Sequence, residues 1–375
     1  MENVYLNRAN ILTPFGLSVE TNWKHLIQGE TAVSKIDSFG HLHNFHAGKI
    51  SATIEKEIES TIENVSHYTR LEKFGIATLQ SIIDVNTLSS KTALFISTTK
   101  GNIDRLSESI EAASISSFAQ KIADYFGFIS APIIICNACV SGVMAVNTAK
   151  RMIQMNRFED AYVLALDELT DFVLTGFNSF QAMDFDLCKP FDAERKGVNL
   201  GEAAACVYLS KKKTNACFQI MGEASINDAN HISGPSRTGE GLVKSVESAM
   251  KEAGINAEQI DYISAHGTAT LYNDEMEAIA FERLNLAQVP INSLKAYFGH
   301  TLGASGLLEI ILAIKQVEEN TLLKSLQLNH LGTSSKLSVL KNTSNIKATI
   351  LLKTSSGFGG SNAVIILKKL ENEAS

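Results

Sequence analysis

Residues 133–142 read IIICNACVSG and join an apolar strand to a helix through a turn of small residues. Three isoleucines fit a buried β-strand, and the apolar pattern over residues 140–155 fits a helix packed on a sheet. Such a turn places Cys139 at the amino end of the helix, where free N–H groups and the positive end of the helix dipole favour a thiolate and can receive an oxyanion. The stretch therefore predicts an α/β fold with a candidate nucleophile at this turn.

The same turn is a CxxC sequence, because Cys136 lies three residues before Cys139. A thioredoxin-like pair and a zinc site are therefore alternatives, although no second cysteine pair or histidine partner has the usual zinc spacing. The apolar strand that leads into the motif favours Cys136 as a buried strand-end residue. From the turn alone, Cys139 is either a nucleophile or an inert core thiol.

Short apolar runs alternate with helical patterns along the chain, which is typical of α/β architecture with a buried sheet. The predicted strands cover residues 92–97, 132–135, 161–166, 204–209, 260–265, 348–352 and 363–367. The predicted helices cover residues 140–155, 241–252, 274–284 and 304–318. Because the strand-to-loop segments 92–101 and 260–270 resemble each other, we expect two similar halves, residues 1–210 and 216–375, with the polar stretch 210–215 at their junction.

Two histidines in the second half follow apolar strands and have glycine neighbours. His266 begins the stretch HGTAT at residues 266–270, and His300 lies in KAYFGHTLGASG at residues 295–306. Imidazole exchanges protons near neutral pH, and glycine lets the backbone approach a ligand. Each histidine alone fits a structural role, but the pair together with Cys139 favours a shared site. The stretch SSGFGGSN at residues 355–362 fits either a glycine-rich turn or a movable plug carried by Phe358.

Composition excludes several classes of function. The 375 residues are 45% hydrophobic and 19% charged, which fits a globular enzyme. The net charge of −7 is spread without a basic stripe, so we expect no nucleic-acid partner. No apolar stretch approaches the roughly 18 residues that span a bilayer, and the N-terminus lacks a signal-peptide pattern. Five cysteines in such a chain do not indicate a disulfide framework, and we expect a cytoplasmic protein.

Together the motifs resemble those of the β-ketoacyl-acyl-carrier-protein synthases, the type I/II condensing enzymes of the thiolase superfamily that use Cys-His-His. The resemblance extends from about residue 11 to residue 367 and includes four motifs in the family's order: NACVSG at 137–142, KPFD at 189–192 through GE at 201–202, HGTAT at 266–270, and the segment from the lysine at 295 to the GHT at 299–301. It implies a thiolase-like α/β fold, with two similar halves forming a layered αβαβα sandwich.

The resemblance also implies a reaction, the decarboxylative Claisen condensation of malonyl-carrier protein with an acyl chain held on Cys139. It assigns malonyl-thioester binding and enolate stabilisation to His266 and His300, and the ordering of the site to Lys295. Other residues match supporting positions of the family: Glu309 as the carboxylate partner of the lysine, Asp274 as the acidic residue eight positions after the first histidine, Thr268 and Thr270 as hydroxyls that bind phosphopantetheine, and Phe358 as the gating aromatic whose N–H joins that of the cysteine in an oxyanion hole.

The partners implied are acyl carrier protein, which brings the substrates on phosphopantetheine, and either a second copy of the chain or a related ketosynthase-like subunit. No metal and no further cofactor are implied, and the pathway is fatty-acid, polyketide or polyene synthesis. Two alternatives are a non-catalytic partner of the chain-length-factor type, which lacks the nucleophile, and a thiolase, which needs a second late cysteine, whereas the last one here is Cys217. Lys196, Val198, Ala203 and Ser356 depart from the family pattern, as does a short region between residues 102 and 132.

Overall fold

The computed structural model describes residues 2–213, 216–229 and 234–371. Its main sheet has two halves that share the same strand order, β6-β5-β7-β9-β1 in the first and β12-β11-β15-β16-β10 in the second. The strands of the first half are β1 (Val4–Thr13), β5 (Thr92–Ser97), β6 (Ile133–Ile135), β7 (Asp160–Asp167) and β9 (Ala203–Ser210). Those of the second half are β10 (Phe218–Asn227), β11 (Tyr262–Ser264), β12 (Ile291–Asn292), β15 (Ile350–Gly357) and β16 (Ser361–Lys369).

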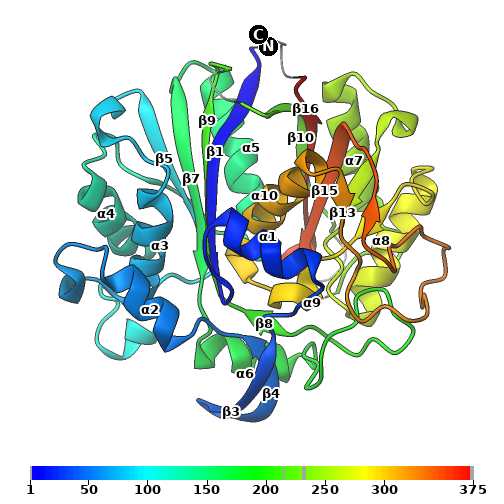
Figure 1. The fold of residues 1–375 in the computed structure, drawn as a ribbon, viewed down its shortest axis with the longest axis horizontal. Helices are drawn as coiled ribbons and strands as arrows, with labels where there is room; N and C mark the ends of the chain where they lie inside the picture. The colour runs from blue at the N-terminus through cyan, green and yellow to red at the C-terminus, as the bar shows by residue number, and fades with distance from the viewer. Residues whose placement is uncertain (1, 214–215, 230–233, 372–375) are drawn as a thin grey trace.

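The two half-sheets lie apart with helices between and outside them, so the molecule has five layers (Figure 1). The central layer consists of α5 (Ser141–Gln154) and α10 (Ser305–Glu318). The outer layer of the first half contains α3 (Arg70–Gln80) and α4 (Ile115–Phe126), and that of the second contains α7 (Glu240–Ala253) and α8 (Leu271–Arg283). The predicted thiolase-like αβαβα sandwich is therefore confirmed.

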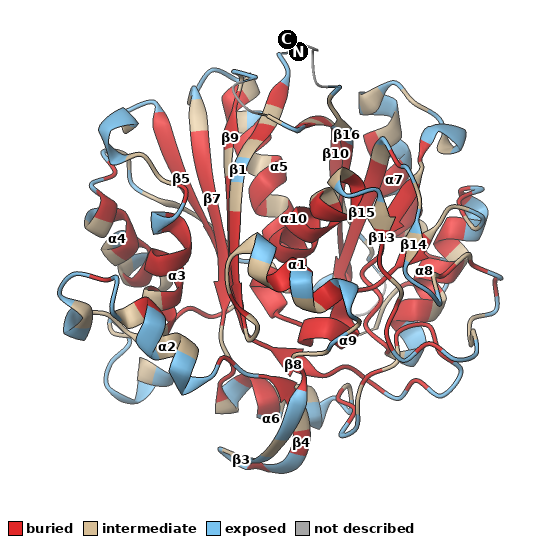
Figure 2. Ribbon diagram, in the orientation of Figure 1, coloured by how far each residue is buried: buried red, intermediate tan, exposed pale blue. Residues whose placement is uncertain are grey.

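Strand β7 shows why the predicted strands are apolar on both faces. Side chains alternate between the two faces of a strand, so Val163 packs into the central core around α5 and α10 while Leu164 packs into the core under α3 and α4. Figure 2 shows the resulting continuous burial of the strands and of the central helices. A strand covered on both sides reads as an unbroken apolar run, which is the pattern over residues 161–166.

The half-sheets meet where β1 pairs antiparallel with β10, over Val4–Leu6 and Phe218–Ile220. Both strands have irregular register there, between Leu6 and Ala9 and between Ile220 and Gly222. The predicted junction coincides with the end of β9 at Ser210, and its residues 214–215 lie outside the described residues. The repeated strand order supports the boundaries 1–210 and 216–375, which stay a prediction.

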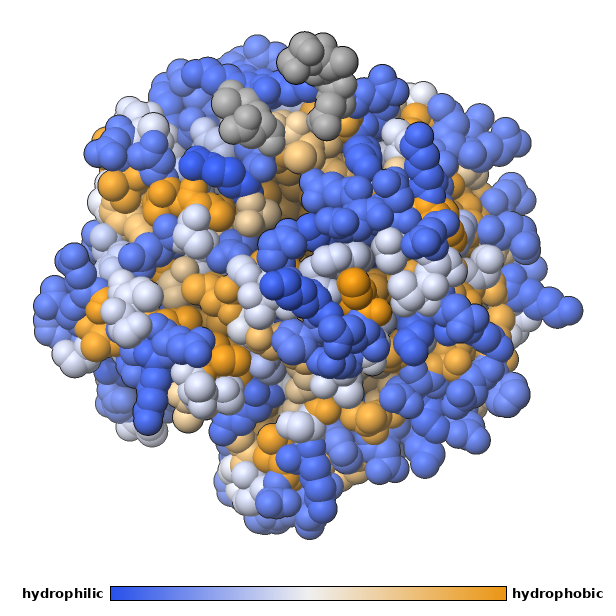
Figure 3. Space-filling view, in the orientation of Figure 1, coloured by the Kyte–Doolittle hydropathy of each residue, from blue (hydrophilic) through white to orange (hydrophobic). Residues whose placement is uncertain are grey.

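Smaller elements surround this sandwich. They are β2 (Gly16–Leu17), α1 (Val19–Ile27), β3 (Ser34–Phe39), β4 (Leu42–Gly48), α2 (Ala52–Glu59), α6 (Asp171–Ser179), β8 (Leu200–Gly201), α9 (Lys295–Phe298), β13 (Thr321–Leu322) and β14 (Ser344–Asn345). Hydrophilic residues cover most of the face drawn in Figure 3, and hydrophobic ones form small separate groups. Within the described ranges, no helix has the length and apolar character needed to cross a bilayer.

Candidate active site

The pocket that contains the predicted cysteine has a volume of about 470 Å³ and receives residues from both halves of the chain. Its lining includes six of the predicted site residues: Cys139, His266, Thr268, Thr270, His300 and Phe358. The sulfur of Cys139 and one ring nitrogen of each histidine all lie within 4.8 Å of one another. The cysteine of the first half therefore meets the two histidines of the second half in one buried place.

Cys139 lies in a sharp turn between β6 and α5. Ala138 adopts a left-handed conformation with φ of 44°, and Ser141 closes the turn by donating to the Ala138 carbonyl at 2.6 Å. Cys139 is only 8% exposed and precedes the first residue of the helix by two positions. Gly357 packs closely against this turn, since an added Cβ there would lie 3.1 Å from the backbone nitrogen of Cys139.

Burial of Cys139 opposes the thiolate that its position at the helix end was expected to favour. Burial raises the pKa of the Cys139 thiol to about 11, and the nearby Asp167 carboxylate adds to this effect. The ammonium group of Lys295 and hydrogen bonds from the backbone N–H groups of Phe358 and Cys139 act in the opposite direction. Those two N–H groups converge at the sulfur, which is the arrangement predicted for an oxyanion hole. Attack by this sulfur therefore requires a neighbouring group that accepts its proton.

His300 lies at a tight passage of the chain between the two halves. Its backbone N–H donates to the Asn199 carbonyl at 2.7 Å, and its carbonyl accepts from the Gly201 N–H at 3.0 Å. The preceding Gly299 has φ of 77°, and a Cβ there would lie 2.4 Å from the Leu200 carbonyl oxygen, so only glycine fits.

The ring of His300 has a defined tautomer. The Leu302 N–H donates to its Nδ1 at 3.3 Å, which places the imidazole proton on Nε2. Nε2 has no partner among the described residues and is therefore free to donate to a ligand. Burial and the Lys295 ammonium lower the pKa of His300 well below its usual range, and Glu309 opposes this shift. A neutral N–H donor of this kind suits an oxygen that becomes negatively charged.

The spacing of the Cys-His-His cluster also fits a soft metal ion, so this alternative needs a physical test. A metal bound at Nε2 of His300 would move the imidazole proton to Nδ1, where it would face the Leu302 N–H. The tautomer therefore disfavours metal binding, and the absence of a metal stays a prediction.

His266 is fixed by two carboxylates of α8. Glu277 accepts from the backbone N–H groups of His266 and Gly267 at 2.9 and 2.7 Å. Asp274 accepts from the backbone N–H groups of Thr268 and Phe191 at 2.9 and 2.7 Å. Glu277 was not predicted as a site residue. Its spacing could have identified it, because a residue three positions after Asp274 lies on the same face of a helix.

The predicted phosphopantetheine-binding hydroxyls are neighbours in the pocket. The Oγ1 atoms of Thr268 and Thr270 lie 2.8 Å apart, and both residues line the cavity. The backbone of this loop is fixed through Asp274, whose pKa burial raises to about 7. Asp274 therefore supports the loop from behind and does not enter the cavity.

Lys295 lies behind the two histidines and pairs with Glu309, as predicted. Both side chains are almost fully buried. The carboxylate of Glu309 also lies 2.5 Å from the Nζ of Lys353, a residue that was not predicted. Glu309 thus bridges two lysines beneath the cavity.

Three phenylalanines form the wall beside the cysteine. Phe358 is 37% exposed, stacks on Phe177 with ring centroids 5.6 Å apart, and meets Phe180 edge-on at 5.4 Å. Three residues that depart from the family pattern, Lys196, Val198 and Ser356, also line the cavity. Phe358 therefore packs on aromatic side chains at the end of α6 that were not predicted, and its gating role stays a prediction.

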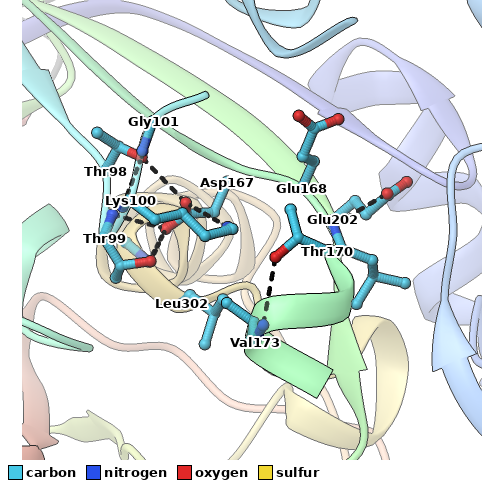
Figure 4. A network of polar contacts seen from close by, with 12 residues as sticks. Thr98, Thr99, Lys100, Gly101, Asp167, Glu168, Thr170, Val173, Glu202 and Leu302 are labelled. Carbon is cyan, nitrogen blue, oxygen red and sulfur yellow. Dashed lines mark hydrogen bonds and ion pairs between the residues drawn. The ribbon is translucent and has the colours of Figure 1, made fainter. Parts of the chain in front are cut away.

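A second polar network holds the His300 turn from the side of the first half. Figure 4 shows Lys100 and the hydroxyls of Thr98 and Thr99 pointing toward the carboxylate of Asp167 at the end of β7. Lys100 donates to Asp167 at 2.8 Å, and the Gly303 N–H donates to the same carboxylate at 2.8 Å. Asp167 thus connects the strand ends of the first half to the turn that carries His300.

We expect Lys100→Met to lower the free energy of unfolding by about 3 kcal/mol, because it leaves the buried Asp167 carboxylate without its cation. Urea unfolding followed by circular dichroism measures the change. Lys244→Met is the matched control, since Lys244 forms an exposed ion pair with Glu240 and its loss has little effect. Equal stability of the Lys100 and Lys244 variants would contradict the structural role of the pair.

Comparison with protein families gives two matches that adjoin. Residues 83–215 match the N-terminal domain of β-ketoacyl synthases, and residues 217–329 match the C-terminal domain, so the two together cover about two thirds of the chain. The nucleophile turn lies in the first match and both histidines lie in the second.

Similar proteins span nearly the full chain. A putative mitochondrial 3-oxoacyl-(acyl-carrier-protein) synthase of Schizosaccharomyces pombe is 26% identical over 425 aligned positions, covering 98% of this chain and 99% of its own. The 3-oxoacyl-(acyl-carrier-protein) synthase 2 of Coxiella burnetii is 25% identical, with 98% of both chains covered. A chain from the complex of the ketosynthase ApeO with its chain length factor ApeC, from Xenorhabdus doucetiae, superposes with a TM-score of 0.88 at 22% identity over 98% of both chains.

Proposed function

Because this chain belongs to the β-ketoacyl synthase family of condensing acyltransferases, we propose that its cavity joins an acyl group held on Cys139 to a malonyl unit with loss of CO2. The observation that carries this proposal is the meeting of one thiol, two convergent backbone N–H groups and two neutral imidazoles in the same buried cavity. Acyl transfer needs a nucleophile and an oxyanion site, and decarboxylation needs donors aimed at a developing enolate oxygen.

The first half-reaction is acyl transfer to the cysteine. The sulfur forms a bond to the acyl carbon, the bond from that carbon to the phosphopantetheine sulfur breaks, and the thiol proton ends on the departing thiolate. The N–H groups of Cys139 and Phe358 stabilise the oxyanion in between. His266 is the imidazole that carries this proton, since His300 already bears one on Nε2 and cannot accept another there while neutral.

The second half-reaction is decarboxylation followed by condensation. The bond between the malonyl carboxylate and its α-carbon breaks, CO2 leaves, and the electron pair forms an enolate on the thioester oxygen. His300 donates from Nε2 to this oxygen, and His266 contributes the second imidazole of the pair. The enolate carbon then attacks the acyl-Cys139 carbonyl, and the cysteine sulfur leaves. Lys295, Glu309 and Asp274 hold these groups in place without touching substrate.

Both substrates arrive on the phosphopantetheine of an acyl carrier protein, for which Thr268 and Thr270 provide hydroxyl groups at the cavity wall. The relatives' names specify acyl-carrier-protein substrates, and this supports the assignment. No other cofactor takes part in the chemistry proposed here. The pathway is fatty-acid or polyketide-type synthesis, and the cytoplasmic location stays a prediction.

The protein pairs with a second copy or with a related ketosynthase-like subunit through the edge strand β6. This strand ends the first half-sheet, and its isoleucines are only partly buried. Ile129, close to it in sequence, is 67% exposed. An uncovered apolar edge strand favours pairing with another chain, and ApeO is solved with such a partner.

Two other functions fit less well. A chain-length-factor-like scaffold has no use for the nucleophile, whereas Cys139 is present with both histidines. A thiolase needs a second late cysteine, and none follows Cys217.

The test is a reconstituted condensation. We expect the purified protein, given acylated and malonylated carrier protein, to release CO2 and form a β-ketoacyl product, both detected by mass spectrometry. Light scattering on the same preparation gives the oligomeric state, and adding a related subunit tests whether one is required. Failure to form product with either subunit composition would refute the proposed activity.

A further inference from the structure

Lys353 is a fully buried lysine in the strand β15 of the second half. Lysine side chains are almost never fully buried unless they are paired. The Nζ of Lys353 donates to the carbonyl oxygens of Ala265 at 3.1 Å and Ser264 at 3.3 Å, and lies 2.5 Å from Oε2 of Glu309. The family resemblance assigned no role to Lys353.

The pattern of β15 directs Lys353 toward the site. Leu351 packs into the central core and Leu352 into the outer core under α7 and α8. Since side chains alternate along a strand, Lys353 faces inward with Leu351, toward α10 and Glu309. Strand β15 also runs parallel to β11 with Lys353 beside Ser264. The lysine therefore ties the carboxyl end of β11 to α10 at the point where the chain continues into His266.

Charge is the second consequence of this position. Glu309 is one carboxylate between two ammonium groups, because its Oε1 pairs with Lys295 and its Oε2 with Lys353. The other ionisable groups that face the histidines or Lys353 are Glu277 from α8 and the Cys139 thiol from the turn before α5. Burial lowers the pKa of Lys353, and Glu309 opposes this effect. Among the causes that lower the pKa of His266, burial comes first and Lys295, His300 and Lys353 follow.

We propose that Lys353 is a positioning residue of the condensation site: it fixes the strand end that carries His266, and it places a second positive charge beside Lys295 beneath the two imidazoles. This role of Lys353 in catalysis rests on the proposed function, the condensation on Cys139. A protonated imidazole could not accept the cysteine proton, so an excess of positive charge beneath the pair protects the first half-reaction. It also keeps His266 and His300 in one protonation state as the pH falls.

The test compares Lys353→Met with Lys353→Arg, which retains the charge. In Lys353→Met we expect the pKa values of His266 and His300 to rise, because a nearby like charge is lost. As the pH falls, the imidazoles of the variant become protonated at a higher pH than those of the wild-type protein. The acid limb of malonyl-carrier-protein decarboxylation therefore moves toward neutral pH. At a pH on that limb, Lys353→Met therefore decarboxylates malonyl-carrier protein more slowly than the wild-type protein. In Lys353→Arg the acid limb stays near its wild-type position.

Two measurements decide the outcome. NMR titration of selectively labelled histidines reports the imidazole pKa values without requiring activity, and the decarboxylation rate between pH 5 and 8 reports the consequence. Lys368→Met is the matched control, because Lys368 is an exposed lysine on the adjacent strand and its loss moves neither readout. Where Lys353→Met does not fold, Lys353→Gln removes the charge while keeping a hydrogen-bond donor.

The failures are distinguishable. Unchanged histidine titration in a folded Lys353→Met or Lys353→Gln protein overturns the role of Lys353. Absence of decarboxylation by the wild-type protein overturns the proposed function instead, and the NMR titration still decides whether Lys353 controls the charge of the pair.

Discussion

Cys139→Ala is expected to abolish β-ketoacyl product formation, with a loss of about 10³-fold or more, because no other group in the cavity can hold the acyl chain. Cys139 is the one thiol that lines the cavity described here, and the two oxyanion-hole N–H groups point at its sulfur. The alanine side chain removes the sulfur without filling new space. The measurement is the rate of product formation from acylated and malonylated carrier protein, together with a mass shift for the acylated protein that the variant lacks.

Cys136→Ala provides the matched control for this experiment. Cys136 belongs to the same CxxC, and the expectation that it is buried is wrong, because it is exposed just after the end of β6. Its sulfur donates to the Thr99 carbonyl, away from the cavity lining. We expect this variant to retain activity near the wild-type rate. Product formation that survives in Cys139→Ala, or an equal loss in both variants, would contradict the assignment of the nucleophile.

His300→Ala is expected to lower malonyl decarboxylation by about 10²- to 10³-fold, which is the usual effect of removing one donor from an oxyanion site. Acyl transfer to Cys139 should fall much less, because the proton on Nε2 prevents His300 from accepting the thiol proton. The two half-reactions are measured separately, as CO2 release from malonyl-carrier protein and as acylation of the protein by acyl-carrier protein.

His67→Ala tests whether the loss is specific to the site, since His67 is an exposed histidine outside the cavity lining. It should leave both rates unchanged. An equal loss of both half-reactions in His300→Ala would overturn the division of roles between the two imidazoles.

Much of the fold could be predicted from residues that are buried on both faces. The run over residues 92–97 coincides with β5, and the runs over 161–166 and 204–209 lie within β7 and β9. Strands β1 and β10 were missed although they join the two half-sheets. Both carry polar residues and a break in register, and each loses the alternating pattern there. An irregular strand whose position depends on a distant partner cannot be recognised from its own residues.

The candidate site could be predicted where a motif combines a reactive side chain with glycine, as at Cys139, His266 and His300. Its charge state could not be predicted, because the pKa of Cys139 depends on burial by chain segments far apart in sequence. Lys353 did give a signal, a charged residue directly after the apolar run at 350–352, but only the fold shows that Glu309 lies opposite it. Phe177 and Phe180 gave no such signal, because the residues around them in the sequence do not indicate that α6 lies beside the glycine-rich turn.

The hydrogen bond from Leu302 to His300 has a consequence for evolution. Since the donor is a backbone N–H, the proton of His300 stays on Nε2 whichever side chain occupies position 302, and only proline removes the donor. Leu302 has φ of 52°, a backbone conformation that glycine and asparagine adopt more readily than leucine. Burial in an apolar cluster and the positive φ restrict which side chains fit at position 302, but the tautomer at the centre of the site does not depend on which of them is present.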